Sequence, residues 1–434
     1  MRIPRASSRS GREAPRTGMA GREFRLLLAA TFSSFAGFAP LLSVVPLWAA
    51  EGGAGHAGVG AATGVTMGAT VAVQLCMGRL LRWLPLRRML LLGSLLLGVP
   101  VFAYALSAGL GWVLTVSAVR GAGFGMVVVA GSALVADLVP VSRRGRAIGL
   151  YGIAVGLPSV IFLPLGVWCA ERFGFSVVFV AAGVFGALSL PLVAAMSRRR
   201  SAPGEAAGQS GRGGPAGAPL PAAGHAAPGP HKPAVGYRAL AAPWLLMITA
   251  ACALGGVTSF LPLALDAPSA APWALFVLSS GVIAGRWAAG VRSDRMGVVG
   301  GLLPVAVAAC AAGMAGFAVA TEVTTGVTAL AVAAALAYGV GFGALQNDTL
   351  VVMFHRAGPQ GIGRASTAWN MAYDAGTGAG SFAIGLLAHA FGLRGAFLVS
   401  AVVIALALPL AWRETPRKQR VRHAGQEPRS PEED

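Results

Sequence analysis

The sequence is poor in charged residues, and it is poorest in acidic ones. Only 12% of its 434 residues are charged, and 16 Asp and Glu stand against 34 Lys and Arg. A soluble globular domain carries about 25% charged residues. Mean hydropathy is +0.68 and 55% of the residues are hydrophobic. Together these values exclude an ordinary soluble enzyme and a disordered chain.

Cysteine and histidine are also scarce. The four Cys lie singly in apolar runs, and the six His form no metal-ligand spacing, which excludes a disulfide scaffold and a zinc module. No Walker loop and no G-x-S-x-G motif occurs, so we expect no enzyme activity, no cofactor and no metal site. The net charge of +18 lacks any recognition motif for nucleic acid, so we do not expect a nucleic-acid partner.

Long runs of apolar residues make up most of the sequence. About 20 apolar residues span a bilayer, and twelve runs have this length. The expected spans are Phe24–Ala50, Val59–Leu81, Met89–Ala108, Trp112–Asp137, Ala147–Ala170, Ser176–Met196, Leu240–Leu265, Pro272–Val291, Val299–Ala320, Val327–Met353, Ala365–Phe391 and Ala396–Trp412. The sequence therefore predicts an all-α membrane protein with 12 transmembrane helices in two six-helix bundles.

The distribution of basic residues predicts the domains and their orientation. We expect a basic cytoplasmic tail at 1–23, an N-terminal bundle at 24–196, a flexible cytoplasmic linker at 197–237, a C-terminal bundle at 238–412 and a cytoplasmic tail at 413–434. The linker holds 16 Gly or Pro in 41 residues, a composition that cannot bury a core. With both termini in the cytoplasm, the cytoplasmic segments and the span ends next to them, which hold Arg25 and Arg79, carry 30 of the 34 Lys and Arg, and outer loops carry two, as the positive-inside rule requires.

The two halves repeat at a constant offset of 218 residues. The stretch that begins at Arg120, RGAGFG, aligns with YGVGFG beginning at Tyr338, and GRA at 145–147 aligns with GRA at 363–365. The dipeptide Phe-Gly at 173–174 aligns with Phe-Gly at 391–392. A parallel six-span repeat is typical of transporters whose site lies between two halves.

Two loops at equivalent places carry a signature. The loop after span eight reads GVRSDRMG, with Gly290, Asp294, Arg295 and Gly297, and it resembles the G-x-x-x-D-[RK]-x-G motif of the major facilitator superfamily. The loop after span two keeps part of this motif. It retains Gly78, Arg87 and Arg88, but Arg82 stands where the family has Asp. The resemblance implies that these loops act as a latch that holds one conformation. A purely structural loop role is the alternative.

Spans four and five resemble those of one branch of this family. Arg120 stands well inside span four, where an Arg needs a partner or a wet cavity, and its surroundings resemble the span-four motif of proton-coupled facilitators. The Gly- and Pro-rich span five, with Pro158, Pro164 and Gly166, partly resembles the motif of drug exporters. The alternatives are a structural Arg and a packing kink.

Spans ten and eleven hold the densest buried polarity. Trp369, Asn370, Tyr373 and Asp374 fall on one helical face. The candidates for proton coupling are Asp374, Arg120 and Asp348, and the candidates for the substrate cavity are Trp369, Asn370, Tyr373, Gln346, Asn347 and Tyr338. Asp348 could instead be a packing or capping residue. Thr258, Ser259 and Gln74 could line the cavity or join helices, which is the commoner role of such residues.

The resemblance implies a secondary transporter for proton-coupled efflux of a small organic molecule, a drug or natural product, by alternating access. With Asp348 and Asp374 in its cavity, an amphipathic cation would fit. The alternatives are a proton-linked importer of a small nutrient or siderophore, and a membrane receptor or scaffold that transports nothing. We expect the partners to be substrate, protons and the lipid bilayer, the functional unit to be a monomer, and the location to be the cell membrane.

The charge distribution and the even number of spans generate a first prediction. Reporter fusions after Gly204 and after Arg420 should both report the cytoplasm, because each point lies in a strongly basic segment. Alkaline phosphatase and green fluorescent protein fusions at each point measure this. An outer-side signal at either point would contradict the twelve-span topology.

Overall fold

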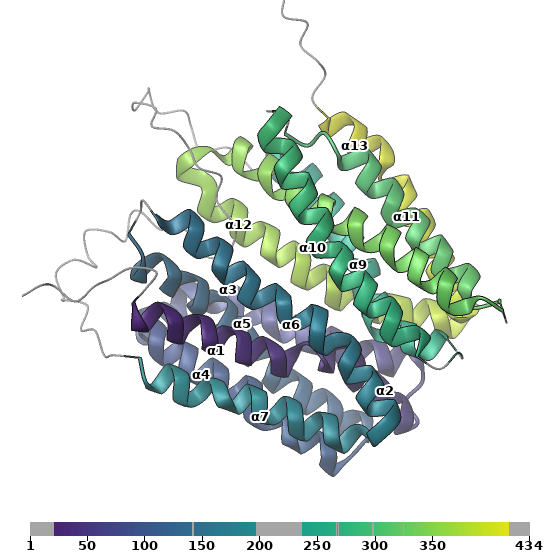
Figure 1. Cartoon of the computed structure of the whole chain (residues 1–434), viewed down its shortest axis with the longest axis horizontal. Coiled ribbons are helices and arrows are strands. Elements are labelled where there is room, and N and C mark those ends of the chain that lie inside the picture. The colour runs from purple at the N-terminus through teal and green to yellow at the C-terminus, as the bar shows by residue number, and fades with distance from the viewer. Residues whose placement is uncertain are drawn as a thin grey trace, which may run out of the picture.

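The computed structural model describes residues 21–140, 143–196, 237–265, 267, 269–296, 299–323 and 325–415. Most of the expected tails and of the expected linker, and Gly297 of the loop motif, lie outside the described residues. The described chain is helical, and Figure 1 shows its helices as two groups packed side by side. The all-α fold class expected from the sequence is confirmed.

The first group contains α1 (Arg22–Phe38), α2 (Leu41–Glu51), α3 (His56–Trp83), α4 (Leu86–Gly98), the 3-10 helix η1 (Val99–Leu106), α5 (Leu110–Leu138), α6 (Arg144–Phe173) and α7 (Phe175–Ala194). These elements form six spans, because α1 with α2 and α4 with η1 each make one crossing. The first expected span is therefore broken. Pro40 separates α1 from α2, since proline cannot supply the N–H that a continuous helix needs.

The second group contains the 3-10 helix η3 (Tyr237–Leu240), α9 (Ala241–Ala264), α10 (Ala270–Met296), α11 (Leu303–Ala320), α12 (Val327–Leu406) and α13 (Leu408–Glu414). As a straight helix, the 80 residues of α12 would be about 120 Å long, several times the ~30 Å hydrocarbon core. Two glycines, Gly358 (φ 66°, ψ 176°) and Gly392 (φ 69°, ψ 171°), interrupt it. Only glycine adopts this backbone readily, and the two breaks divide α12 into the last three spans.

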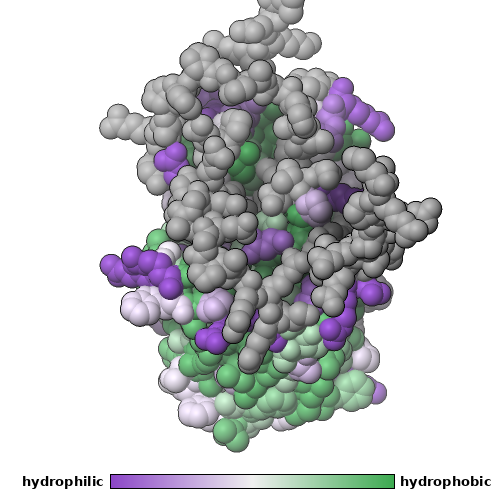
Figure 2. Space-filling model, turned by 90° about the vertical axis from the view of Figure 1, so that its left-hand side faces the viewer, coloured by the Kyte–Doolittle hydropathy of each residue, from purple (hydrophilic) through white to green (hydrophobic). Residues whose placement is uncertain are grey.

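Composition and length independently support a membrane-spanning body. Eleven stretches of the described chain are long and apolar enough to cross a membrane, and the last of them, Gly361–Glu414, has 54 residues, enough for two crossings. Large hydrophobic side chains such as Leu75, Val184 and Leu386 are exposed on the outer faces. We call the end where α1 begins and α7 ends the basic end. Figure 2 views it, with hydrophilic side chains gathered above a hydrophobic body.

The 218-residue repeat is visible in the backbone. Gly174, between α6 and α7, has φ 87° and ψ 162°, nearly the same conformation as its repeat partner Gly392. The α5 glycines Gly121 and Gly125 lie against α3, and their repeat partners Gly339 and Gly343 lie against α10. Within each half, the same pair of helices therefore packs closely through glycines at equivalent positions, as small residues allow in membranes.

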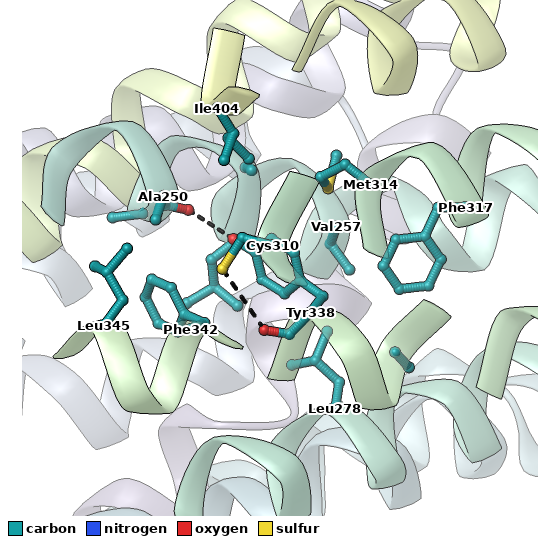
Figure 3. Close-up of a cluster of buried hydrophobic side chains, with 14 of the residues drawn as sticks. Ala250, Val257, Leu278, Cys310, Met314, Phe317, Tyr338, Phe342, Leu345 and Ile404 are labelled. Atoms are coloured by element: carbon teal, nitrogen blue, oxygen red, sulfur yellow. Dashed lines mark hydrogen bonds between the residues drawn. The ribbon is translucent and has the colours of Figure 1, made fainter. Parts of the chain in front are cut away.

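Each bundle has its own core. Figure 3 shows part of the core of the second bundle, where α9, α10, α11 and α12 meet. Tyr338 is fully buried there. Its hydroxyl donates to the carbonyl of Ala250 at 2.6 Å, and the Cys310 thiol donates to its carbonyl at 3.9 Å. A side chain satisfied in this way is a packing residue. The structure thus places Tyr338 within the core, with its ring stacked on that of Phe342 at 5.8 Å, and its place in a substrate cavity stays a prediction.

The glycine contacts generate a second prediction. A side chain at Gly343 would collide with the α10 backbone at Val282 and at the nitrogen of Arg286. Gly343→Leu should therefore destabilise the protein by about 1–3 kcal/mol through overpacking, which a melting temperature in detergent measures. Gly149→Leu is the matched control, because Gly149 has open space around it. Equal melting temperatures for the two variants would contradict this packing.

Candidate functional site

The two bundles are joined near the middle of the body by a hydrogen bond between side chains. The Gln74 amide on α3 donates to the Asp374 carboxylate on α12 at 2.7 Å. Both side chains are buried, at 9% and 5% exposure, and the Gln74 carbonyl oxygen has no hydrogen-bond partner in the described part of the chain. Asp374 belongs to the eleventh span and Gln74 to the second. The two side chains therefore lie on different bundles, and their hydrogen bond breaks when the bundles move apart around these residues.

Aromatic rings lie beside this contact on α12. The rings of Trp369 and Tyr373 stack with centroids 6.2 Å apart and an interplanar angle of 16°. Phe342, from the tenth span, lies 6.2 Å from Tyr373. The indole N–H of Trp369 donates to the Thr349 hydroxyl at 3.1 Å, which fixes the orientation of the ring. The predicted cavity residues Trp369 and Tyr373 are therefore brought together with Asp374.

Arg286 on α10 belongs to the same place, although it was not among the predicted site residues. Its guanidinium lies 5.9 Å from the ring centre of Trp369, over its face, a distance at which cation–π attraction acts. The side chain is half-buried. The signal in the sequence was an Arg several residues inside the eighth expected span, as Arg120 is in the fourth.

The other predicted cavity residues lie in two different kinds of surroundings. Gln346 is buried on the tenth span, one turn after Phe342. The Asn347 amide faces the Asp348 carboxylate at 3.4 Å, at the limit of a hydrogen bond. Asn370 donates to the Ser366 carbonyl of its own helix at 2.9 Å. Gln346 thus lies with the aromatic rings, whereas Asn347 and Asn370 are engaged in local contacts.

Asp348 has a structural partner. Its carboxylate accepts a hydrogen bond from the backbone N–H of Leu302 at 3.0 Å, at the residue that caps the N-terminus of α11. A carboxylate at the N-terminus of α11 accepts a hydrogen bond from a backbone N–H that has no partner within the helix, and the helix dipole favours its negative charge. This contact is the one that the capping alternative predicts for Asp348, and its role in proton coupling stays a prediction.

Arg120 is enclosed within the first bundle. It is 2% exposed, it donates to the Tyr104 hydroxyl at 3.1 Å, and its guanidinium lies over the rings of Phe38 and Tyr104. Its Nε and one terminal nitrogen have no hydrogen-bond partner. A small cavity of about 10 Å³ adjoins it, lined also by Thr63 and Thr66, room for about one water molecule. Arg120 and Asp374 form no ion pair in this conformation.

Hydroxyl groups join the bundles nearer the end opposite the basic end. Ser259 on α9 shares hydrogen bonds with Thr63 on α3 at 3.0 Å and with Ser381 on α12 at 2.8 Å. Ser43 on α2 donates to the Thr258 carbonyl at 2.5 Å. We call Ser43, Thr63, Ser259 and Ser381 the hydroxyl cluster. It closes the space between the bundles on this side.

The first loop motif lies at the basic end. Gly78 is exposed, with no neighbour for an added Cβ, so no helix approaches it here. Arg82 lies in the last turn of α3, exposed like Arg88. Arg87 donates to the carbonyls of Val193 at 3.3 Å and of Ala194 at 2.6 Å, at the end of α7. Arg87 thus ties α4 to α7 inside one bundle.

The second loop motif is helical for most of its length, contrary to its assignment as a loop. Gly290, Asp294 and Arg295 belong to the last turns of α10, because the helix continues beyond the apolar run into the aqueous region. Asp294 is exposed and has no hydrogen-bond or ion-pair partner among the described residues. Its role as a latch stays a prediction.

Two six-span bundles, joined by a buried hydrogen bond between Gln74 and Asp374 with an aromatic group of the second bundle beside it, define a multi-pass membrane protein of the transporter type. The sequence model of the Major Facilitator Superfamily matches residues 27–381, which is most of the chain. The chain therefore belongs to the Major Facilitator Superfamily, and the resemblance stated from the loop motifs is confirmed.

Individual relatives resemble the chain at two levels. Uncharacterized MFS-type transporters of Pseudomonas aeruginosa strains UCBPP-PA14 and LESB58 are each 38% identical over 94 residues, 21% of this chain and 23% of theirs. The match thus spans about a quarter of the length of these curated relatives.

Two solved structures share the fold. A bacterial homolog of the human lysosomal transporter Spinster, inward-facing and unoccupied, has a TM-score of 0.68 at 16% identity, covering 92% of this chain and 100% of that one. A mutant of the nucleoside transporter NupG has a TM-score of 0.65 at 13% identity, covering 90% and 99%.

The hydroxyl cluster generates a third prediction. Ser259→Ala removes the hydrogen bond to Thr63, which crosses between the bundles and is worth about 0.5–1.5 kcal/mol. The population open at the end opposite the basic end should therefore rise about 2- to 10-fold. Distances between spin labels at Ser107→Cys and Thr325→Cys, repeat partners in the loops of that end, measure this in a chain without its four native cysteines. The control Ser400→Ala removes a bond within one helix. Unchanged distances in Ser259→Ala would contradict the closing role.

Proposed function

We propose that the protein is a proton-coupled secondary transporter that exports a small organic molecule by alternating access. The observation that carries this proposal is the Asp374 carboxyl group, which is buried between the two bundles and bonded to Gln74 of the opposite half. A carboxyl group at this depth is costly as an anion. Its protonation is therefore tied to the arrangement of the groups around it.

The geometry gives Asp374 different surroundings in different conformations. With the bundles in contact, the Gln74 amide donates to the carboxylate and lowers the cost of its charge. When the bundles part at this level, that donor is withdrawn and water or a proton must replace it. A proton that binds one conformation more tightly than the other shifts their populations by the same factor, which is the thermodynamic requirement for coupled transport.

We further propose that the basic end faces the cytoplasm of a cell membrane and that the hydroxyl cluster closes the outer side. The concentration of Arg at the basic end supports this orientation under the positive-inside rule. In this arrangement the aromatic rings and Arg286 are approached from the cytoplasm. We expect a single chain to be the transporting unit, because the site is formed within one chain.

An exporter and an importer could both use these residues, and the direction of substrate flux distinguishes the two functions. A proton-linked importer of a small nutrient would accumulate substrate with the inward proton gradient. An exporter would move it against that gradient. Proteoliposomes of known orientation with an imposed pH gradient distinguish the two. A receptor would show neither flux.

The fourth prediction tests coupling. Asp374→Asn keeps the size of the side chain and a hydrogen bond with Gln74, but it cannot release a proton. We expect it to abolish uphill flux driven by a pH gradient and to retain substrate counterflow in the same vesicles. Asp348→Asn is the matched control, because Asp348 caps α11, and it should keep gradient-driven flux.

Two outcomes would contradict this role of Asp374. Full gradient-driven flux in Asp374→Asn would mean that the proton binds elsewhere. Loss of both fluxes in a correctly inserted protein would place Asp374 in substrate binding rather than on the proton path.

A further inference from the structure

Arg286 is a cation in the membrane-spanning body that forms no ion pair and no hydrogen bond with any residue that the structure describes. Its guanidinium lies over the face of Trp369 and interacts electrostatically with Tyr373. An Arg at this depth is rare and costly, and it normally pairs with an acid or faces a functional cavity. A charge left in this state indicates that its partner comes from outside the chain.

The acidic residues nearby are engaged elsewhere. Asp374 accepts a hydrogen bond from Gln74 across the bundle interface, and Asp348 accepts one from the backbone of Leu302. Neither forms an ion pair with Arg286. The two carboxylates that favoured a cationic substrate in the sequence therefore have structural partners, and the group that lacks one is positive.

The side chains next to Arg286 are aromatic, and in this conformation they are packed in the core of the second bundle. Trp369 and Tyr373 are stacked, and Phe342 continues the row. The Trp369 ring is held in place by its bond to Thr349, so it presents a fixed face. The backbone of Arg286 lies against Gly343 of the tenth span, which places the guanidinium at the side of this row.

Two further donors at the row are unused. The Tyr373 hydroxyl has no hydrogen-bond partner among the described residues, and neither has the side-chain amide of Gln346, which is one turn from Phe342 on the same helix. A guanidinium, a phenol and an amide beside an aromatic face can together bind an oxygen-rich anion attached to a planar ring.

We propose that the substrate is an aromatic carboxylate. Its carboxylate pairs with the fork of the Arg286 guanidinium, and its ring stacks on Trp369 and Tyr373. A cation of the same shape is rejected because Arg286 repels it. This inference rests on the proposed function, in which alternating access opens a cavity at these residues, and adds the chemical class of the substrate.

Three ligands with one ring test the charge preference. They are 1-naphthoate, the neutral 1-naphthamide and the cationic 1-naphthylmethylammonium, each titrated by calorimetry into the full chain in nanodiscs of phosphatidylcholine, which carry no anionic lipid. Wild type should bind naphthoate tightest, naphthamide about 10- to 100-fold more weakly, as expected for loss of a charged hydrogen-bonded pair, and the ammonium weakest.

Variants assign the preference to Arg286. Arg286→Gln should weaken naphthoate binding by about 10- to 100-fold and leave naphthamide binding nearly unchanged. Arg286→Lys should restore part of the loss, because lysine keeps the charge but not the planar fork. The retained naphthamide binding shows that each variant is folded. Arg394→Gln is the matched control, since Arg394 is exposed and paired with Glu322 at 3.3 Å, and it should bind naphthoate like wild type.

The outcomes separate this inference from the proposed function. Tighter binding of the ammonium than of naphthoate, equal naphthoate affinity in wild type and Arg286→Gln, or no binding of any of the three ligands would overturn the substrate class. Arg286-dependent binding of naphthoate without flux under a pH gradient would support the substrate class and contradict coupled transport. Gradient-driven flux of the ammonium alone would support coupled transport and overturn the substrate class.

Discussion

The hydrogen bond between Gln74 and Asp374 connects the two bundles through buried side chains. Each bundle has an apolar core, and Val59, Leu163 and Val167 of the first bundle also join the core of the second. In the described chain, the side-chain groups that form hydrogen bonds between the bundles are hydroxyls, one amide and one carboxylate. Polar contacts of this kind cost little to exchange for water when two surfaces separate, whereas an apolar core would resist separation. Among the groups that form these hydrogen bonds, the carboxylate is the one whose charge can change when the bundles part.

Glycine sets how closely the helices around this site approach. The fourth span packs against the second through Gly121 and Gly125, and the tenth packs against the eighth through Gly339 and Gly343. The close packing of the tenth span against the eighth brings Arg286 next to the rings of Trp369 and Tyr373 on α12. Because the glycines recur at an offset of 218 residues, the same scaffold occurs twice, while Asp374 and Arg286 occur only in the second half. Their repeat partners are Gly156 and Gly68, so neither charge is required by the shared fold.

The fold could be predicted from the sequence because bilayer thickness and the 218-residue repeat act over long, continuous segments. Runs of about 20 apolar residues predict crossings irrespective of tertiary contacts. Finer features depended on local chemistry. Pro40 divides the first span, the helix α10 extends past its apolar run to include Asp294, and Gly358 and Gly392 reverse the chain within a few residues.

The site was predicted only in part, because its contacts join residues far apart in the chain. Trp369, Tyr373 and Asp374 share one helix face, and this periodicity could be recognised. Nothing in the sequence indicates that Gln74, 300 residues away, bonds to Asp374. Nor does it distinguish the capping role of Asp348 from a role in proton transfer, or the buried Tyr338 from a cavity residue. Arg286 could have been nominated as an Arg inside a span, yet only the structure shows that no acid pairs with it.

The central claim is that the protonation of Asp374 is linked to the arrangement of the bundles. The most direct test is to measure distances between spin labels on the two bundles between about pH 5 and pH 9, in wild type and in Asp374→Asn, without substrate. The account predicts that the populations of the two conformations change with pH in wild type and that this change is lost in Asp374→Asn. An equal pH dependence in both proteins would contradict it.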